Sequence, residues 1–293
     1  MIDAQVPARS SRSARDRASL APVLLKGVSY VALTTLAALC LIPFAWMALT
    51  SLKPEDEVMT NPPRWLPSVA AWWNYPRAFT FYPFDRFLWN TTVVALGATL
   101  LQTVVAVLAA YAFARLRFPG RNILFMAYLG TLMIPQQVTI VPLFLMMRTA
   151  GLADTYWALI LPSAFHAFGV FLMRQFLMTL PRELEESAYI DGASRLRVLW
   201  QVLLPLSRPA LATLILFTFI REWNAFLWPL IATRSLEMRT VAVGLTLFTG
   251  QYGTEWHLLM AAATVTIIPS LIVFALAQRY YIEGIALSGF GGR

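Results

Sequence analysis

The stretch from residue 181 to residue 211 carries acidic and small side chains at the spacing of a binding element. Three acidic residues follow a proline there, namely Glu183, Glu185 and Glu186. Proline is tolerated in the first turn of a helix, and acidic side chains stabilise that end. Asp191 and Gly192 predict the end of this helix, because glycine adopts the positive φ that redirects the chain. The pattern indicates a docking element rather than a random loop.

A second short helix is predicted from about Ala193 to Leu203. Apolar residues recur there at steps of three and four, which gives this helix one apolar stripe. The stripe consists of Leu196, Leu199, Val202 and Leu203, with Arg195 and Arg197 off it. Pro205 and Pro209 are expected to stop or kink the helix. On physical grounds alone, such a helix pair either docks on a partner or rests on lipid headgroups.

The composition places these helices in a membrane protein. Of the 293 residues, 58% are apolar and 13% are charged, and the mean hydropathy is +0.62. Soluble domains of this size do not have such a composition. About 20 apolar residues cross the hydrocarbon core, so the intervals between charged residues count the crossings.

Six intervals are long enough, which predicts an all-α integral membrane protein with six transmembrane helices. Four are free of charge, at 26–53, 86–115, 121–148 and 255–279. A fifth, 154–174, contains His166, and a sixth, 208–234, contains Arg221 and Glu222. Residues 26–293 are expected to form one transmembrane domain with no soluble domain appended, and residues 1–25 a flexible basic cytoplasmic tail.

The placement of basic residues predicts that both termini are cytoplasmic, since cytoplasmic loops near span ends collect arginine and lysine. The tail and the loops at 114–122 and 174–208 are basic, whereas the loop at 53–86 mixes basic and acidic residues without net positive charge. This orientation puts the helix pair at 181–206 on the cytoplasmic side.

Several classes of function are disfavoured. A P-loop needs Gly-Lys followed by Ser or Thr, yet the only lysines, Lys26 and Lys53, each follow leucine. His166 and His257 are the only histidines and occur without H-E-x-x-H or C-x-x-C, so no metal and no hydrolytic chemistry is expected. The net charge of +8 is spread over loops without an aromatic platform, which argues against nucleic acid. A single cysteine, Cys40, excludes an internal disulfide.

The segment around 181–206 resembles the EAA loop of ATP-binding-cassette importer permeases. Glu186-Ser187-Ala188 is followed after three residues by Gly192, and nine residues later by Val202, with Leu204-Pro205 next. The second position is usually alanine in that family, and Ser187 is a small departure. The resemblance implies that these two helices dock into a cleft of an ATPase subunit. It assigns ATPase coupling to Glu186, Ser187, Ala188, Asp191, Gly192, Leu204 and Pro205.

The resemblance extends over about residues 48–293 and points to the carbohydrate-uptake subgroup, similar to the smaller membrane subunit of maltose-type importers. The segments that carry it include 51–54, 74–75, 87–91, 111–121, 134–138, 223–224, 228–230 and 278–285. Each is weak alone, but their order is specific. Residues 1–25 resemble nothing in that pattern.

The resemblance implies a permease subunit of the bacterial inner (cytoplasmic) membrane that forms half of a translocation pathway for a sugar. Its partners would be a homologous permease subunit, two ATPase subunits and an extracytoplasmic solute-binding protein. ATP and Mg²⁺ would be bound by the ATPase subunits, and no cofactor by this chain. ATP binding and hydrolysis would drive alternating access through the docked loop.

Polar residues inside spans are the candidates for the substrate pathway. They are Gln136 and Gln137 after Pro135, the group Glu222, Trp223 and Asn224 beside Arg221, and His166. The structural alternative is that each only satisfies a neighbouring helix or subunit. A glycerol-3-phosphate-type polyol phosphate stays open as substrate because Arg221 is basic. Two alternatives to an importer permease come from other classes of protein: a secondary transporter that works without an ATPase, and a membrane enzyme or scaffold.

Overall fold

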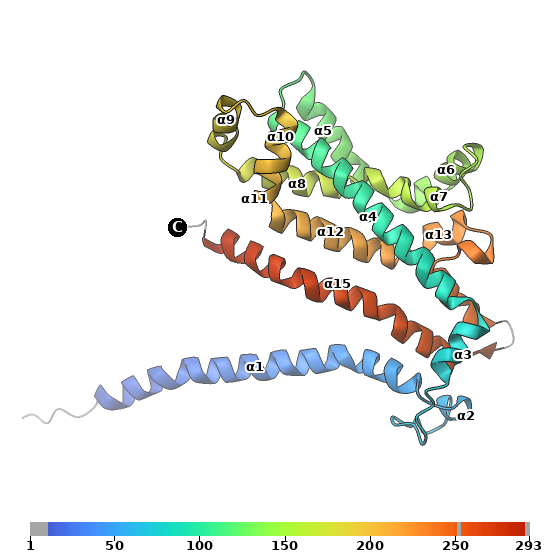
Figure 1. Ribbon diagram of the computed structural model, residues 1–293. Coiled ribbons are helices and arrows are strands. Elements are labelled where there is room, and N and C mark those ends of the chain that lie inside the picture. Colours follow the sequence, from blue (N-terminus) through green and yellow to red (C-terminus); the bar gives the residue numbers. More distant parts are fainter. Residues whose placement is uncertain (1–10, 251–252, 291–293) are drawn as a thin grey trace, which may run out of the picture.

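A long central helix, α4 (Phe84–Arg115), organises the computed structural model, which describes residues 11–250 and 253–290. It packs against α8 (Ala167–Thr179) and α12 (Arg208–Trp223) (Figure 1). Alanines on its buried face, including Ala98, Ala106 and Ala110, let these helices approach closely. The predominantly helical architecture expected from the sequence is confirmed.

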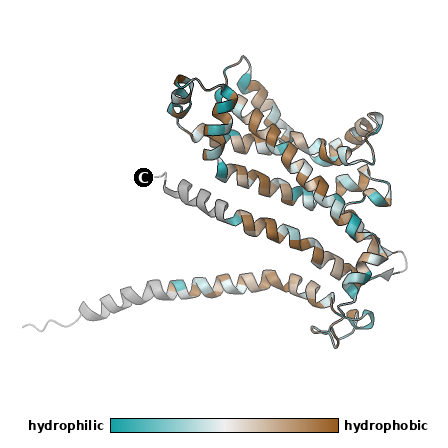
Figure 2. Ribbon diagram, viewed as in Figure 1, coloured by the Kyte–Doolittle hydropathy of each residue, from teal (hydrophilic) through white to brown (hydrophobic). Residues whose placement is uncertain are grey.

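Within the part of the chain that the structure describes, three helices are long and apolar enough to cross a membrane: Leu25–Thr50 within α1 (Ser11–Thr50), α4, and Trp256–Gln278 within α15 (Trp256–Phe290). Three further crossings result if each bent helix pair counts as one span, which brings the number to as many as six. Figure 2 shows these helices as mostly hydrophobic and the loops between them as hydrophilic. The chain is therefore a multi-pass membrane protein.

The third predicted span is not one straight helix. It consists of α5 (Arg121–Gly130) with the 3-10 turn η1 (Thr131–Met133), and α6 (Gln136–Thr149), which meet at an angle of 102°. Pro135 explains the bend, because proline has no N–H to donate and holds the preceding residue in an extended conformation. Ile134 has that conformation, with a ψ of 116°.

Helix α1 differs from the tail expected at residues 1–25. The helix begins at Ser11, so it includes residues assigned from the sequence to a flexible segment, while residues 1–10 lie outside the described part. Arginine, alanine and leucine all favour helix, which accounts for the extension. The apolar window of α1 is 0% buried, and in Figure 1 α1 runs apart from the rest of the bundle. Its surface is thus available to lipid or to another subunit.

Short elements join the long helices at the end of the bundle opposite α9. Polar side chains hold this end together. Asn74 donates to the carbonyls of Ser51 and Lys53 at 2.9 and 2.8 Å, and the hydroxyls of Ser51 and Tyr75 are 2.8 Å apart. Asn90 donates to the carbonyls of Glu237 and Arg239, at 2.7 and 2.8 Å. Three segments singled out in the sequence, 51–54, 74–75 and 87–91, therefore have structural roles.

The remaining elements are α2 (Glu55–Val58), α3 (Asn74–Phe81), α7 (Tyr156–Ile160), η2 (Pro162–Phe165), α13 (Leu227–Ala232), η4 (Leu236–Met238), α14 (Val241–Leu245) and η5 (Thr246–Phe248). Two short antiparallel strands, β1 (Thr249–Gly250) and β2 (Gly253–Thr254), pair Thr249 with Thr254.

Candidate functional site

The helix pair predicted from the sequence lies at one end of the bundle, beyond the last turns of α4 and α8 (Figure 1). Its first helix is α9 (Glu183–Ile190), which ends at a turn where Gly192 has a φ of +81°. The positive φ is the conformation that glycine adopts at low cost. Ser194 then caps the next helix, its side chain accepting the amide of Arg197 at 3.4 Å. Both predicted helices and the turn between them are present.

The second helix runs further than the sequence predicted. It comprises α10 (Arg195–Val198), a π-helical turn η3 (Leu199–Leu203) and α11 (Leu204–Leu206), so Pro205 does not end it. Proline has no N–H to donate, and its ring crowds the carbonyl four residues earlier, so a widened π turn before Pro205 accommodates it within the helix. The break comes at Ser207, where the helix meets α12 at 83°.

The buried face of this helix also differs from the predicted stripe. Val198, Leu199 and Leu203 are fully buried, and Leu204 nearly so, whereas Leu196 is 60% exposed. The π turn shifts the register of the helix, which turns Leu196 away from the bundle. Leu196 is therefore part of an outer surface and not of the core.

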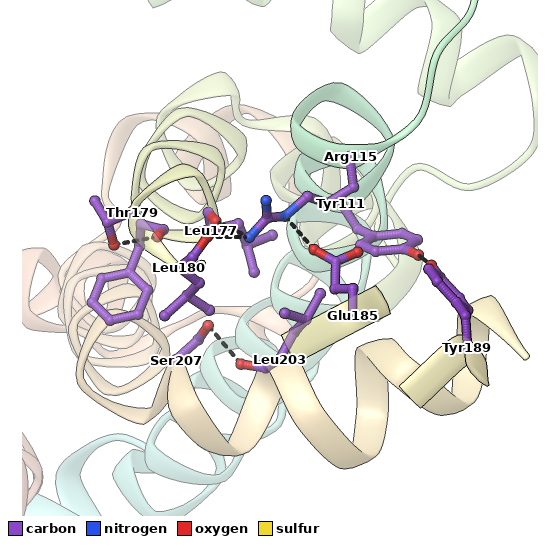
Figure 3. A network of polar contacts seen from close by, with 10 residues as sticks. Tyr111, Arg115, Leu177, Thr179, Leu180, Glu185, Tyr189, Leu203 and Ser207 are labelled. Carbon is purple, nitrogen blue, oxygen red and sulfur yellow. Dashed lines mark hydrogen bonds and ion pairs between the residues drawn. The ribbon is translucent and has the colours of Figure 1, made fainter. Parts of the chain in front are cut away.

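Glu185, rather than Glu186, attaches α9 to the bundle. One carboxylate oxygen of Glu185 lies 2.7 Å from Nε of Arg115, at the end of α4, and both side chains are less than a tenth exposed. Arg115 also donates through Nη2 to the carbonyls of Leu177 and Leu180, at 2.7 and 2.8 Å (Figure 3). One guanidinium thus joins the ends of α4 and α8 to α9.

Other contacts extend this network. The hydroxyls of Tyr111 and Tyr189 lie 3.3 Å apart, which connects α4 with the last turn of α9 (Figure 3). Burial raises the pKa of the Glu185 carboxyl, although the charges of Arg115 and Arg182 oppose the shift. The buried carboxylate is costly, and Arg115 is what makes it tolerable.

A pocket of about 310 Å³ opens between α4 and α9, and we call it the α4–α9 pocket. Charged side chains dominate its lining, which includes Arg115, Arg117, Arg182, Glu185, Glu186 and Arg195. Glu186 is exposed at its rim, as is the neighbouring Ser187, while Ala188 packs partly against the core. The predicted E-S-A segment therefore presents two polar side chains outward and one small side chain inward.

Large apolar side chains are exposed next to these charges. Ile190 is 87% exposed, Trp200 54% and Tyr189 40%, and Leu196 belongs to the same helix pair. Asp191 and Gly192 are exposed at the turn between the helices, Pro205 is exposed and Leu204 is buried. Mixed apolar and charged surface of this kind is typical of a protein interface.

A second polar cluster lies within the bundle. Arg221 donates to one carboxylate oxygen of Glu222 through Nε and Nη2, at 3.0 and 2.8 Å, and through Nη2 to Oε1 of Gln102 at 2.5 Å. Gln102 belongs to α4 and is fully buried, and its Nε2 has no hydrogen-bond partner among the described residues. Sequence reasoning missed Gln102, although it is an amide placed among apolar residues in the middle of a span.

The other predicted pathway residues are dispersed. Trp223 is buried and donates to the carbonyl of Thr266 at 3.0 Å, while Asn224 is exposed and donates to the carbonyl of Ile220 at 2.8 Å. His166 precedes α8, and its Nδ1 lacks a partner within the described chain. Gln136 and Gln137 are exposed in the first turn of α6. None of these residues lines the α4–α9 pocket.

One group of metal-ligand residue types occurs at the opposite end of the bundle. Ligand atoms of Glu55, Glu255 and His257 lie within 4.8 Å of one another. Nδ1 of His257 is 3.9 Å from the Glu255 carboxylate. Ligands of one tetrahedral zinc ion are roughly 3.3 Å apart, so this looser spacing supports no metal assignment.

Comparisons with known proteins agree on one family. Residues 102–286 match the family described as "Binding-protein-dependent transport system inner membrane component". The chain is 36% identical over 255 residues to the sn-glycerol-3-phosphate transport system permease protein UgpE of Yersinia pestis bv. Antiqua, covering 84% of this chain and 91% of that protein. It is 34% identical to the arabinooligosaccharides transport system permease protein AraQ of Halalkalibacterium halodurans, covering 88% and 93%.

A solved structure gives the same result. One chain of a bacterial ABC transporter involved in the import of the acidic polysaccharide alginate matches with a TM-score of 0.79 and 26% identity, covering 94% of this chain and 100% of that chain. The family match includes α8 to α12, the C-terminal part of α4 from Gln102 and most of α15, and therefore both polar clusters. This chain belongs to the family of inner-membrane permease components of binding-protein-dependent ABC transport systems.

Proposed function

We propose that this chain forms half of the translocation pathway of an ATP-driven sugar importer and that its α9–α10 helix pair docks on an ATPase subunit. The observation that carries this proposal is an exposed helix pair held to the bundle by a buried ion pair, Arg115 with Glu185. A docking element must move as one body with the helices that it drives. In this role Glu186 and Ser187 face the ATPase, and Ala188, Gly192 and Leu204 shape the loop.

The chain itself supplies the route from the docking helices to the pathway. The helix that ends at Leu206 continues through one residue, Ser207, into α12. Ser207 is buried, and its hydroxyl donates to the carbonyl of Leu203 at 2.8 Å. Rotation of the helix pair is thus passed to α12, which carries Arg221 and Glu222 at its far end. At 1.5 Å per residue, the 16 residues of α12 give a lever about 24 Å long.

The orientation follows from this role. The α9 end and both termini are cytoplasmic, residues 26–293 form a single transmembrane domain, and a solute-binding protein delivers substrate at the opposite end. ATP and Mg²⁺ belong to two ATPase subunits, since neither Lys26 nor Lys53 stands in a P-loop. A second, homologous permease subunit completes the pathway and covers apolar surface such as that of α1.

The substrate is a sugar, an oligosaccharide or a related polyol. Gln102, Arg221, Glu222 and His166 offer the hydrogen-bonding groups that hydroxyls require, with Gln136, Gln137, Trp223 and Asn224 as further candidates. Because Glu222 neutralises Arg221, a neutral sugar is the first choice. A polyol phosphate is the second, favoured by the 36% identity to a glycerol-3-phosphate permease and by the exposed third of the Arg221 side chain.

The first experiment is to purify the chain from its native membrane in mild detergent and identify what accompanies it. An ATPase subunit, a second permease and a solute-binding protein are expected, and the binding protein is then screened with sugars and with glycerol 3-phosphate. Recovery of the chain alone, in stable symmetric oligomers, would instead indicate a transporter that works without an ATPase.

The second experiment is the substitution Glu186→Lys, which reverses the charge facing the ATPase. We expect uptake to be abolished and the ATPase to be lost on purification, with membrane insertion unchanged. Glu183→Lys is the matched control, because Glu183 is an exposed acid in the first turn of the same helix but outside the E-S-A segment. Normal uptake in Glu186→Lys would defeat the proposed docking role.

A further inference from the structure

A second pocket lies beside the α4–α9 pocket and shares Arg117 and Arg182 with it. It has a volume of about 540 Å³ and is formed by the loop between α4 and α5, the first turn of α5 and Arg182 at the start of α9. We call it the α5 pocket. Arg117, Arg121 and Arg182 line it, and none of the described lining residues is acidic.

Among the described residues, no carboxylate lies within ion-pairing distance of the arginines of this pocket, although the charge of Glu185 acts on Arg182 from further away. Arg115 and Arg221 have carboxylate partners, whereas no carboxylate of the described chain pairs with Arg117, Arg121 or Arg182. Arg121 donates only to the carbonyl of Leu116 and to the side chain of Asn122, at 3.1 and 3.4 Å. Guanidinium groups stay charged at any physiological pH, so three of them around one pocket repel one another unless an anion is present.

The backbone contributes further donors to the same pocket. Gly120 precedes α5 with a φ of +76°, and no side chain caps the helix. The first N–H groups of a helix lack carbonyl partners within it and attract anions. In α5 the amides of Arg121 and Leu124 already donate to the carbonyls of Phe118 and Gly120, at 3.4 and 2.9 Å, so Asn122 and Ile123 carry the amides that remain for an anion. A phosphate has the oxygens to accept both from these amides and, in bidentate fashion, from arginine.

The position of the pocket identifies the source of the phosphate. Arg115 ends the spanning helix α4 and Arg121 begins α5, so the loop between them lies at the boundary of the hydrocarbon core. In the first two turns of α5, the apolar side chains of Ile123, Leu124 and Met126 are 76%, 55% and 67% exposed. This combination of a basic pocket and an adjacent apolar helix face fits a phospholipid, whose phosphate would meet the arginines and whose acyl chains would lie along α5.

We propose that the α5 pocket binds the phosphate of an anionic phospholipid headgroup. The lipid phosphate joins Arg117 and Arg121 of the α4–α5 loop to Arg182 at the start of α9. Because Arg117 and Arg182 also line the α4–α9 pocket, the bound lipid steadies the base of the docking helices. This last consequence rests on the proposed function, whereas the lipid site itself does not.

The test is native mass spectrometry of the purified full-length chain with its co-purified subunits, titrated with phosphatidylglycerol or phosphatidylcholine. Wild type is expected to retain phosphatidylglycerol over phosphatidylcholine. Arg117→Gln with Arg121→Gln should weaken phosphatidylglycerol binding about 25-fold, which is roughly fivefold for each arginine near an anionic surface. Arg197→Gln is the matched control, because Arg197 is an exposed arginine at the same end that lines neither pocket.

Equal retention of phosphatidylglycerol by wild type and the double variant would overturn the proposal. So would loss of an ATPase subunit instead of lipid, which would mark the pocket as a protein contact. Competition by inorganic phosphate alone at millimolar concentration would identify a free anion as the ligand and overturn the lipid assignment. Arg117→Lys guards against misfolding, since it keeps the charge and should retain part of the lipid. Selective retention of phosphatidylglycerol by a wild-type chain that co-purifies with no ATPase subunit would count against the transport role and leave the lipid site standing.

Discussion

Two arginine–glutamate pairs of almost equal length, 2.7 and 2.8 Å, serve different purposes in this protein. Arg115 and Glu185 come from helices far apart in the sequence, and both are nearly inaccessible, so their pair determines where α9 lies. Arg221 and Glu222 are neighbours on α12, and the Arg221 side chain is 35% exposed. The comparison shows that the same kind of ion pair fixes the position of a helix where it is buried between elements, and leaves the arginine partly exposed where it is local.

The largest effect is expected from Arg115→Ala, which leaves Glu185 buried without its counter-charge and two carbonyls of the α8 end without a donor. Removing one partner of a buried pair costs roughly 3–5 kcal/mol. The loss of stability is measured by thermal unfolding of the purified chain in detergent and by the amount of the variant that accumulates in the membrane. Glu185→Ala should lower the stability by less, because Arg115 still donates hydrogen bonds to the carbonyls of Leu177 and Leu180.

The pH dependence of the same pair sharpens the comparison. Since burial raises the pKa of Glu185, the folded state binds a proton more readily than the unfolded state. Stability should therefore rise as pH falls toward the ordinary glutamate value, and more steeply in Arg115→Ala than in wild type. Identical pH profiles in the two proteins would argue that the ion pair does not govern the position of α9.

Arg221→Ala is expected to affect transport more than folding. It removes hydrogen bonds to Glu222 and Gln102, each worth about 1.5–3 kcal/mol when one partner is charged, but water or a ligand can replace part of them. We expect uptake to fall at least tenfold while the ATPase still co-purifies. Arg208→Ala, at the other end of the same helix, is the control. Equal loss of folded protein in Arg115→Ala and Arg221→Ala would contradict the assignment of a structural role to Arg115 and a transport role to Arg221.

Gly169→Ala tests the packing around the intramembrane cluster. A Cβ there would lie 2.9 Å from Leu214, 3.1 Å from Cβ of Ala106 and 3.2 Å from Nε2 of Gln102. Overpacking costs about 1–3 kcal/mol, offset by about 1 kcal/mol of helix propensity. A drop in the midpoint of thermal unfolding is expected, whereas Gly130→Ala, with nothing within 4 Å of its added Cβ, should be neutral or stabilising.

Asp154→Asn should have the smallest effect, about 1 kcal/mol. Burial opposes ionisation of Asp154, but amide hydrogen bonds from Arg234 and Ser235 prevail and lower its pKa below the ordinary 3.8. Its contribution is therefore complete at neutral pH and is lost only as pH falls below about 3.8. Equal stability loss at pH 7 and pH 3 on substitution would contradict this assignment.

The fold could be anticipated where it depends on composition. Charge-free intervals marked the long helices α1, α4 and α15, because apolar length is what a bilayer requires. The turn at Gly192 was likewise readable, since few residues accept a φ of +81°. The 102° bend at Pro135 was not, because proline permits a bend without setting its angle.

The α9–α10 helix pair was anticipated in part, because local spacing is readable in the sequence whereas contacts between helices are not. The spacing from Glu186 to Pro205 marked the helix pair, but not which acid faces inward, since Glu185 and Glu186 are neighbours with the same chemistry. Gln102 was missed because an amide surrounded by apolar residues carries no spacing signal. Only packing revealed its contact with Arg221.

The amino-acid sequence alone determined that this chain crosses the membrane several times and carries a short, charged helix pair, because hydropathy, glycine and proline act locally. Tertiary structure decided which arginine meets which glutamate, that Leu196 faces outward and that three arginines surround one pocket. Those outcomes depend on how helices distant in the chain pack together, and long-range packing leaves no periodic trace in a single sequence.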